Sequence, residues 1–402
     1  MTSPPILRRT ALAGGALVAI TGLVGCNDRR LRADVGPLTE APPPTPSAPA
    51  SSGVTIGMGS VKVALILPLT GPGQGAIAGQ SLRNAAELAM TEFQGADVTI
   101  LVKDDKGTAE GAREAANAAL AEGAELVIGP LFAPAVSAAG QVARAAGKPV
   151  IAFSTDTTIA SRGVYLLSFT PQPEVERVVS YATGQGRRSF AALIPESYYG
   201  NVVEGAFREA AAKSGARVVA VERYASGQPG PAVQRLTAIV SGDAAQADAI
   251  FIPDSGESLA AVGTALGGIS FNPGRVKPLG TGVWNDPRAT RIAALQGGWY
   301  AAPDQAGFAA FSGRYRAKFG SEPSRIATLS YDAVSLVVAL ARTQGPGRFS
   351  DSVLLGAAGF SGVDGTFRFR SDGGNDRTLA VLELRDGTTG VVSPAPKTLG
   401  AA

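Results

Sequence analysis

Residues that could carry catalysis are almost absent from this chain. It contains no histidine, and its only cysteine is Cys26. Without histidine, Ser–His–Asp catalysis, Cys–His catalysis and every histidine-based metal site are excluded. The carboxylates do not cluster in any pattern that resembles a metal-binding loop. The sequence therefore predicts a protein that is not an enzyme and that uses no cofactor and no metal.

A glycine-rich turn, Gly71–Gly75, is the next candidate for chemistry because such turns can cradle phosphates. Its glycines stand at Gly71, Gly73 and Gly75. This GxGxG spacing does not match the GxGxxG pattern of a dinucleotide-binding loop, and the later acidic residue of that pattern is missing. We interpret these residues as turn glycines.

The charge balance argues against a nucleic-acid partner. The chain has 36 basic and 33 acidic residues and a net charge of +3. Arg8 and Arg9 lie in a segment that we expect to be removed, which brings the net charge closer to zero. No basic run with interleaved aromatic residues is present, so the pattern that marks nucleic-acid binding is missing.

The elements that must position any site follow a repeating unit. Val61–Leu67 is an apolar run that is too short to span a membrane and suits a buried strand. Behind it, Leu82, Ala85, Ala86 and Ala89 recur at helical spacing. Alternating strands and helices predict parallel sheets covered on both faces. Further strands are expected at 98–102, 126–128, 150–153, 164–169, 190–194, 218–221, 249–252 and 279–280.

Counting two more strands near the C-terminus, the chain holds about eleven strands, which is too many for one sheet. Gly184-Gln185-Gly186 divides the series into two similar halves, so we expect two α/β lobes with a cleft between them. Ligands of such sheets lie outside the carboxyl ends of the strands, which places the loop Leu69–Gly75 at the ligand edge. Near the C-terminus, residues 363–369 and 378–384 alternate as the two strands of a hairpin would.

The N-terminal segment predicts export and lipidation. Residues 1–25 combine a basic start with a short apolar stretch, as in a signal peptide. Leu23-Val24-Gly25-Cys26 resembles a bacterial lipobox, which implies a lipid on Cys26; the alternative is a plain signal peptide with a chance cysteine. Residues 26–60 are rich in Pro, Ala and Ser and predict a disordered tether. We expect a periplasmic, lipid-anchored protein, and Asn27 favours the outer membrane.

Several short motifs occur in order along residues 61–390. They are Pro68-Leu69-Thr70-Gly71-Pro72 with Gly79-Gln80, Asp104-Asp105, Gly129-Pro130, Pro149-Val150-Ile151 with Ser154-Thr155, Tyr331-Asp332-Ala333-Val334, and Gly362-Val363-Asp364-Gly365-Thr366-Phe367-Arg368-Phe369. Their order and spacing resemble those of periplasmic leucine/isoleucine/valine-binding proteins.

This resemblance implies a type I periplasmic-binding fold of the α/β class. Each of its two lobes would be a mostly parallel sheet flanked by helices, and the chain would cross between the lobes three times. Residues 61–183 and 305–345 would form the first lobe. Residues 187–300 and 350–395 would form the second.

The resemblance also suggests first-lobe residues that face the cleft. In that family, loop hydroxyls and backbone N–H groups at strand ends hold the charged groups of the ligand. Ser154, Thr155 and Asp156 match a small-residue and threonine pair, although Ser154 and Asp156 could equally cap the next turn. Thr70 lies in the first loop. Phe132 replaces part of a serine-rich turn of the amino-acid binders, so one donor is missing.

Three second-lobe residues complete the predicted binding set. Tyr199 matches a cleft tyrosine of the family, or is a surface aromatic. Asp254 could meet an ammonium group, or cap the helix that follows Ser255. Trp284 could form a wall of the cleft, or pack in the core.

Two functions fit these observations. The first is a leucine-binding-like lipoprotein that binds a small polar solute, such as an amino acid or amide, for the membrane subunits of an ABC importer. The second is a tethered protein-recognition lipoprotein that regulates a peptidoglycan synthase. The lipobox, the Pro-rich tether and the missing serine turn resemble lipoproteins that activate penicillin-binding proteins, although those carry an additional helical-repeat domain.

Overall fold

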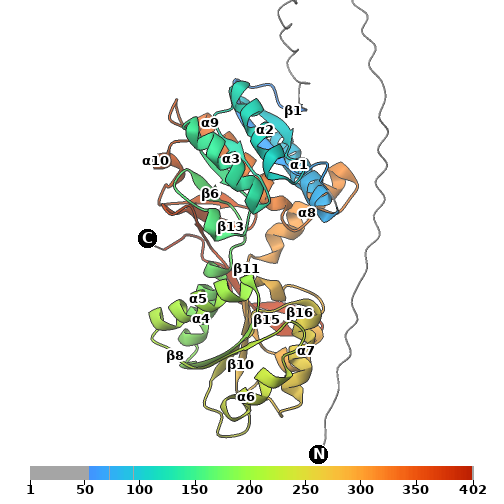
Figure 1. Cartoon of the computed structure of the whole chain (residues 1–402), viewed down its shortest axis with the longest axis vertical. Helices are drawn as coiled ribbons and strands as arrows, with labels where there is room; N and C mark the ends of the chain where they lie inside the picture. Colours follow the sequence, from blue (N-terminus) through green and yellow to red (C-terminus); the bar gives the residue numbers. More distant parts are fainter. Residues whose placement is uncertain (1–53, 72, 94, 401–402) are drawn as a thin grey trace, which may run out of the picture. The chain divides into compact units, whose positions relative to one another are not determined.

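The computed structural model describes residues 54–400 apart from 72 and 94 (Figure 1). The predicted signal peptide, Cys26 and residues 27–53 of the predicted tether lie outside the described residues.

The first sheet has the strand order β1-β3-β2-β4-β5-β6. β1 runs antiparallel to β3, and the other neighbours are parallel. In β2, every residue except Lys62 is buried, because this strand lies inside the sheet with helices on both faces. The strands are β1 (Thr55–Ile56), β2 (Val61–Leu67), β3 (Val98–Asp104), β4 (Val127–Ile128), β5 (Val150–Ala152) and β6 (Val164–Leu166).

Two pairs of helices cover this sheet (Figure 1). α1 (Gln74–Glu92) and α9 (Ala327–Thr343) share one core with the sheet, which α8 (Gln305–Phe319) extends through Phe311 and Tyr315. α2 (Ala109–Ala121) and α3 (Ala133–Ala145) pack small alanine side chains on the other face.

The second sheet has the order β16-β15-β11-β10-β9-β7-β8. Its strands β8, β7, β9, β10 and β11 are parallel, and β15 and β16 are antiparallel additions at one edge. The strands are β7 (Ser189–Pro195), β8 (Arg217–Tyr224), β9 (Ala249–Phe251), β10 (Lys277–Gly280), β11 (Trp299–Ala302), β15 (Ala380–Arg385) and β16 (Thr388–Ser393).

Helices also cover both faces of the second sheet (Figure 1). α4 (Pro171–Gly184) and α5 (Tyr198–Lys213) pack on one face. α6 (Gly230–Val240) and α7 (Gly256–Gly267) pack on the other. The predicted α/β architecture with two mostly parallel, helix-flanked sheets is thus confirmed, and the chain crosses between the sheets three times: between β6 and α4, between β11 and α8, and between β14 (Asn375–Arg377) and β15.

The predicted C-terminal hairpin is wrong. β13 (Gly365–Phe369) pairs with β12 (Phe360–Gly362) and with β14 in a separate antiparallel sheet. The side chains of Phe367 and Phe369 belong to the core of the first lobe, together with Leu354 of the short helix α10 (Asp351–Leu354). β15 pairs instead with β11 and β16. Alternation of apolar residues shows that a strand has one buried face, but it does not show which strand lies beside it.

The first crossing also lies earlier than predicted. Val175, Val178 and Val179 of α4 pack with the second sheet, so the chain leaves the first lobe before Pro171. Gly184-Gln185-Gly186 ends α4 and does not mark the crossing. A glycine-rich connector signals the end of a helix, and in this chain that end falls inside the second lobe.

The predicted tether extends too far toward the C-terminus. Residues Thr55 and Ile56 pair with Leu101 and Ile100 as an edge strand. Main-chain hydrogen bonds hold this strand in place, so a two-residue strand needs no recognisable apolar pattern.

None of the helices in the described part of the chain is both long enough and apolar enough to cross a bilayer.

Candidate functional site

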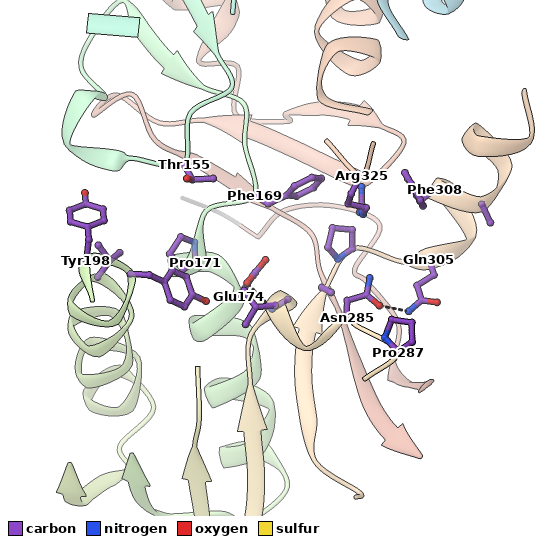
Figure 2. Close-up of a pocket in the computed structure, with 17 residues that line it drawn as sticks. Thr155, Phe169, Pro171, Glu174, Tyr198, Asn285, Pro287, Gln305, Phe308 and Arg325 are labelled. Carbon is purple, nitrogen blue, oxygen red and sulfur yellow. Dashed lines mark hydrogen bonds between the residues drawn. The ribbon is translucent and has the colours of Figure 1, made fainter. Parts of the chain in front are cut away.

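A cavity of about 790 Å³ lies where the crossing segments and the strand ends of the two lobes meet (Figure 2). Segments that follow β5, β7, β10 and β11 line it, together with the first turns of α4 and α8 and the residue Arg325 before α9. These strands are parallel within their sheets, so their carboxyl ends open toward this space. The cavity therefore occupies the position at which open α/β sheets bind ligands.

Most of the wall is apolar. Phe169 and Phe308 contribute aromatic rings from the first-lobe side, and Tyr198 and Tyr199 of α5 contribute rings from the second lobe. Val202 and several proline and alanine side chains fill the spaces between them. A wall of this kind suits the hydrophobic body of a small molecule.

Glu174 is the buried acidic group of the cavity. It stands in the first turn of α4, and its Oε2 accepts a hydrogen bond of 2.8 Å from the backbone N–H of Gly282. A Cβ at position 282 would lie 2.6 Å from Glu174 Oε1, so any side chain there would displace the carboxyl group from this position. Burial raises the pKa of Glu174 to about 7, against the opposing effects of the Gly282 hydrogen bond and the positive charge of Arg325.

Arg325 is the basic group of the cavity. Its guanidinium lies 4.6 Å from the ring centres of both Phe169 and Phe308, and Figure 2 shows it between them. Two nitrogens donate to the buried carboxylate of Asp364, at 2.7 and 3.0 Å. The stacked rings and this forked ion pair fix the guanidinium plane, while about a third of the Arg325 side chain stays exposed.

Three further polar side chains border the cavity. Gln305 donates to the amide oxygen of Asn285 at 2.8 Å. Thr155 is exposed in the loop that follows β5. Across the described residues, no group of acidic side chains is arranged to hold a metal ion.

Of the predicted binding residues, Thr155 and Tyr199 line the cavity. The hydroxyl of Tyr199 is hydrogen-bonded to Thr281 at 2.6 Å, and burial raises its pKa far above the usual value for tyrosine. Tyr199 therefore presents mainly its ring to the cavity.

Ser154 and Asp156 stabilise the loop that presents Thr155. The Oγ of buried Ser154 accepts a hydrogen bond of 3.1 Å from the backbone N–H of Asp156. The Asp156 carboxylate accepts from the N–H of Thr158 at 2.9 Å, which caps a 3-10 turn, and from the hydroxyl of Tyr198 at 2.7 Å. The bond to Tyr198 joins the two lobes beside the cavity.

Thr70 and Phe132 do not line the cavity. The hydroxyl of Thr70 donates to the Asp104 carboxylate, which ties the loop after β2 to the end of β3. Phe132 precedes α3 and is 40% exposed, and a Cβ at Gly75 would lie 3.1 Å from its ring.

Asp254 and Trp284 also lie outside the cavity lining. Asp254 accepts hydrogen bonds from Tyr224 and Ser258 and from the N–H of Ser255, so it organises the start of α7. Trp284 is fully buried in the second-lobe core, and its indole N–H donates to the carbonyl of Ile252 at 3.0 Å.

Sequence reasoning missed Glu174 and Arg325. An acidic residue in the first turn of a helix is typical of helix starts, and an arginine before a helix is unremarkable. Glu174 was missed because the first crossing between the lobes was placed too late in the chain. A crossing at Ser168–Pro171 would have put Glu174 beside the cleft.

The family is decided by a match between residues 60–389 and the family model of periplasmic binding proteins. The chain belongs to the periplasmic binding protein family. This family binds solutes and is not a family of enzymes, which confirms that part of the sequence-based prediction.

Solved structures show the same fold as this periplasmic binding protein. A protein from Rhodospirillum rubrum assigned to a branched-chain amino acid ABC transporter is 23% identical, with a TM-score of 0.72, over 83% of this chain and 99% of its own. A solute-binding protein of an ABC transporter from Rhodopseudomonas palustris BisB5, in complex with 3,4-dihydroxybenzoic acid, is 22% identical, with a TM-score of 0.57, over 85% and 97%.

A branched-chain amino acid transporter substrate-binding protein from Streptococcus pneumoniae, in complex with isoleucine, is 20% identical, with a TM-score of 0.56, over 83% and 99%. A search of curated proteins finds no match to this periplasmic binding protein.

Proposed function

We propose that this protein captures a small solute in the cavity between its lobes and presents it to the membrane subunits of an ABC importer. The observation that carries the proposal is the cavity itself. Its volume of about 790 Å³ lies within the range of about 300–1,000 Å³ that is usual for ligand pockets. Its wall is apolar, and a few polar groups converge on it from both lobes.

The lobes would close on the solute as two rigid bodies. Three crossing segments connect them, and such segments act as hinges in two-lobed binding proteins. A solute that contacts Tyr198 and Tyr199 on one side and Phe308 on the other would bind the closed form more tightly than the open form. Only this difference in affinity can drive closure.

The lining favours a solute with a hydrophobic body, such as an amino acid with a branched or aromatic side chain or an aromatic acid. Two proteins with this fold were solved with solutes of these kinds, isoleucine and 3,4-dihydroxybenzoic acid. A small amide without a hydrophobic body would leave most of the apolar wall unfilled.

The same proposal places the folded part in the periplasm, held to a bacterial membrane by a lipid on Cys26. The lipobox-like residues Leu23–Cys26 and the Pro-rich segment behind them support this placement, and Asn27 favours the outer membrane. The alternative, regulation of a peptidoglycan synthase, requires no small-molecule cavity, so the cavity favours the solute-binding function.

A thermal-shift screen tests the proposal. The full chain carrying C26S is heated with branched and aromatic amino acids, aromatic acids, small amides and peptidoglycan fragments. A solute at a hundred times its dissociation constant should stabilise the protein by about 2.7 kcal/mol. Stabilisation by any solute supports solute capture. If no solute in the panel raises the melting temperature, recognition of a peptidoglycan synthase is favoured.

A further inference from the structure

We infer that Arg325 and Glu174 bind opposite ends of the solute. The cavity would therefore select a carboxylic acid that also carries a hydrogen-bond donor. The acid would meet Arg325, and the donor, an ammonium or a hydroxyl group, would meet Glu174. This inference rests on the proposed function, because it names the class of solute that the cavity would take.

The two groups are held on different lobes. Glu174 belongs to α4 of the second lobe, and Arg325 precedes α9 of the first. In Figure 2, Glu174 rises from α4 on one side of the cavity, and Arg325 lies on the opposite side. They form no ion pair with each other among the described residues, so each is available to a solute that spans the space between them.

Glu174 keeps one acceptor atom for the solute. Its Oε2 is bonded to Gly282, whereas its Oε1 has no hydrogen-bond partner within residues 54–400. Glu174 lines the cavity, so this free oxygen can accept a hydrogen bond from a donor on the solute. Arg325, Tyr199 and the backbone N–H of Gly282 surround the group, and none of them donates to Oε1.

Arg325 keeps donor atoms for the solute. Asp364 occupies one face of its fork through both terminal nitrogens, and Nη1 also reaches the hydroxyl of Thr328 at 3.3 Å. Its Nε–H has no partner in the described part of the chain, and the side chain borders the cavity. Guanidinium groups pair well with carboxylates because their geometries match.

Phe169 and Phe308 fix the position of Arg325 and the direction from which a solute can approach it. Both rings stack on Arg325, and both line the cavity. The hydrophobic body of the solute would contact the exposed parts of these rings, so its acid group would approach Arg325 from within the cavity.

Matched pairs of solutes test the contact with Arg325 and the contact with Glu174 separately. Calorimetry on the full C26S chain compares L-phenylalanine with 3-phenylpropanoate, and 3,4-dihydroxybenzoate with benzoate, which removes the donor. It also compares L-phenylalanine with L-phenylalaninamide, and 3,4-dihydroxybenzoate with 3,4-dihydroxybenzamide; in these pairs the acid group is replaced by a neutral amide. We expect the acid with a donor to bind about tenfold or more tightly than either truncated partner, as for a hydrogen bond to a charged group.

Two conservative variants assign these preferences to residues. E174Q keeps an acceptor for the Gly282 N–H, and it should abolish the preference for the donor while the preference for the acid persists. R325K keeps a cation beside Asp364, and it should shrink the acid-over-amide preference several-fold while the donor preference persists. The melting temperature of each variant without solute reports whether it has folded.

The outcomes distinguish this inference from the proposed function. Amides that bind as tightly as acids, or a donor preference that survives in E174Q, overturn the inference while solute capture stands. Failure of every solute to bind the folded wild-type chain contradicts the proposed function, and the inference falls with it.

Discussion

The hydroxyl of Tyr198 donates a hydrogen bond of 2.7 Å to the carboxylate of Asp156, and this bond joins the two lobes beside the cavity. Asp156 follows β5 of the first lobe, whereas Tyr198 is the first residue of α5 in the second. The bond to Asp156 raises the pKa of the Tyr198 hydroxyl. Because it spans the lobes, this contact should form only while they are close together.

Y198F should therefore weaken solute binding and speed solute release. The hydrogen bond is solvent-exposed, so its contribution lies toward the lower end of about 0.5–1.5 kcal/mol, and we expect an affinity loss of about two- to threefold. Stopped-flow measurement of solute release gives the rate.

Y199F is the matched control for that experiment. It removes a neighbouring hydroxyl whose bond to Thr281 lies within the second lobe, so it should leave the release rate nearly unchanged. Equal effects of the two variants would show that the bond between Tyr198 and Asp156 does not hold the lobes together.

The buried carboxyl of Glu174 should make the stability of the protein depend on pH. Burial raises its pKa from 4.5 to about 7, so the folded state binds this proton more tightly than the unfolded state. Between these values the folded chain holds more protons, and the free energy of unfolding should fall as the pH rises from about 5 to about 7. Asp105, whose pKa burial raises to about 6, contributes with the same sign.

Urea unfolding at several pH values measures this dependence. E174Q should reduce the slope between about pH 6 and 7 without removing it, because burial also raises the pKa of Asp332 to about 7, and D105N should act mainly at lower pH. An unchanged slope in E174Q would show that Glu174 is not protonated preferentially in the folded protein.

Trp284 should stabilise the second lobe rather than contact the solute. It is fully buried, and a Cβ at Gly280 would lie 2.2 Å from its ring, so glycine at 280 gives the indole its place against β10. W284A removes this packing and the indole hydrogen bond to the Ile252 carbonyl, which keeps only its bond from the Asp254 N–H. We expect a loss of about 3–5 kcal/mol in the free energy of unfolding.

Denaturant titration measures that loss, with V391A as the control because Val391 is 48% exposed. The control should change stability by about 0.5 kcal/mol or less. A stable W284A protein with weakened solute binding would instead identify Trp284 as a wall of the cleft.

Lipidation of Cys26 predicts where the protein is found in the cell. The wild-type chain should fractionate with membranes, and C26S should move to the soluble fraction because a lipid anchor requires the thiol. Mass spectrometry of the mature wild-type protein should show acyl chains on an N-terminal Cys26. If the wild-type protein is soluble and carries no lipid, the prediction of lipidation is wrong and residues 1–25 are a plain signal peptide.

The sequence predicted the architecture because apolar runs and helical periodicity repeat along the chain. The resemblance to leucine/isoleucine/valine-binding proteins pointed to Thr155 and Tyr199, and both line the cavity. It could not assign Asp254 and Trp284, because an acid before a helix and a tryptophan after a strand have the same pattern whether they cap, pack or bind. Glu174 and Arg325 line one cavity only because of where the chain crosses between the lobes, and no local sequence pattern shows where it crosses.

The central claim is that a solute occupies the cavity between the lobes, and neighbouring alanines of α8 offer a direct test. Ala309 and Ala310 are both exposed, but only Ala309 lines the cavity. Calorimetry compares A309W and A310W with the wild-type binding domain in the C26S chain, using the tightest-binding solute of the panel. We predict that A309W, which fills the cavity, abolishes binding and that A310W binds as the wild type does. Undiminished binding by a folded A309W protein would contradict the claim.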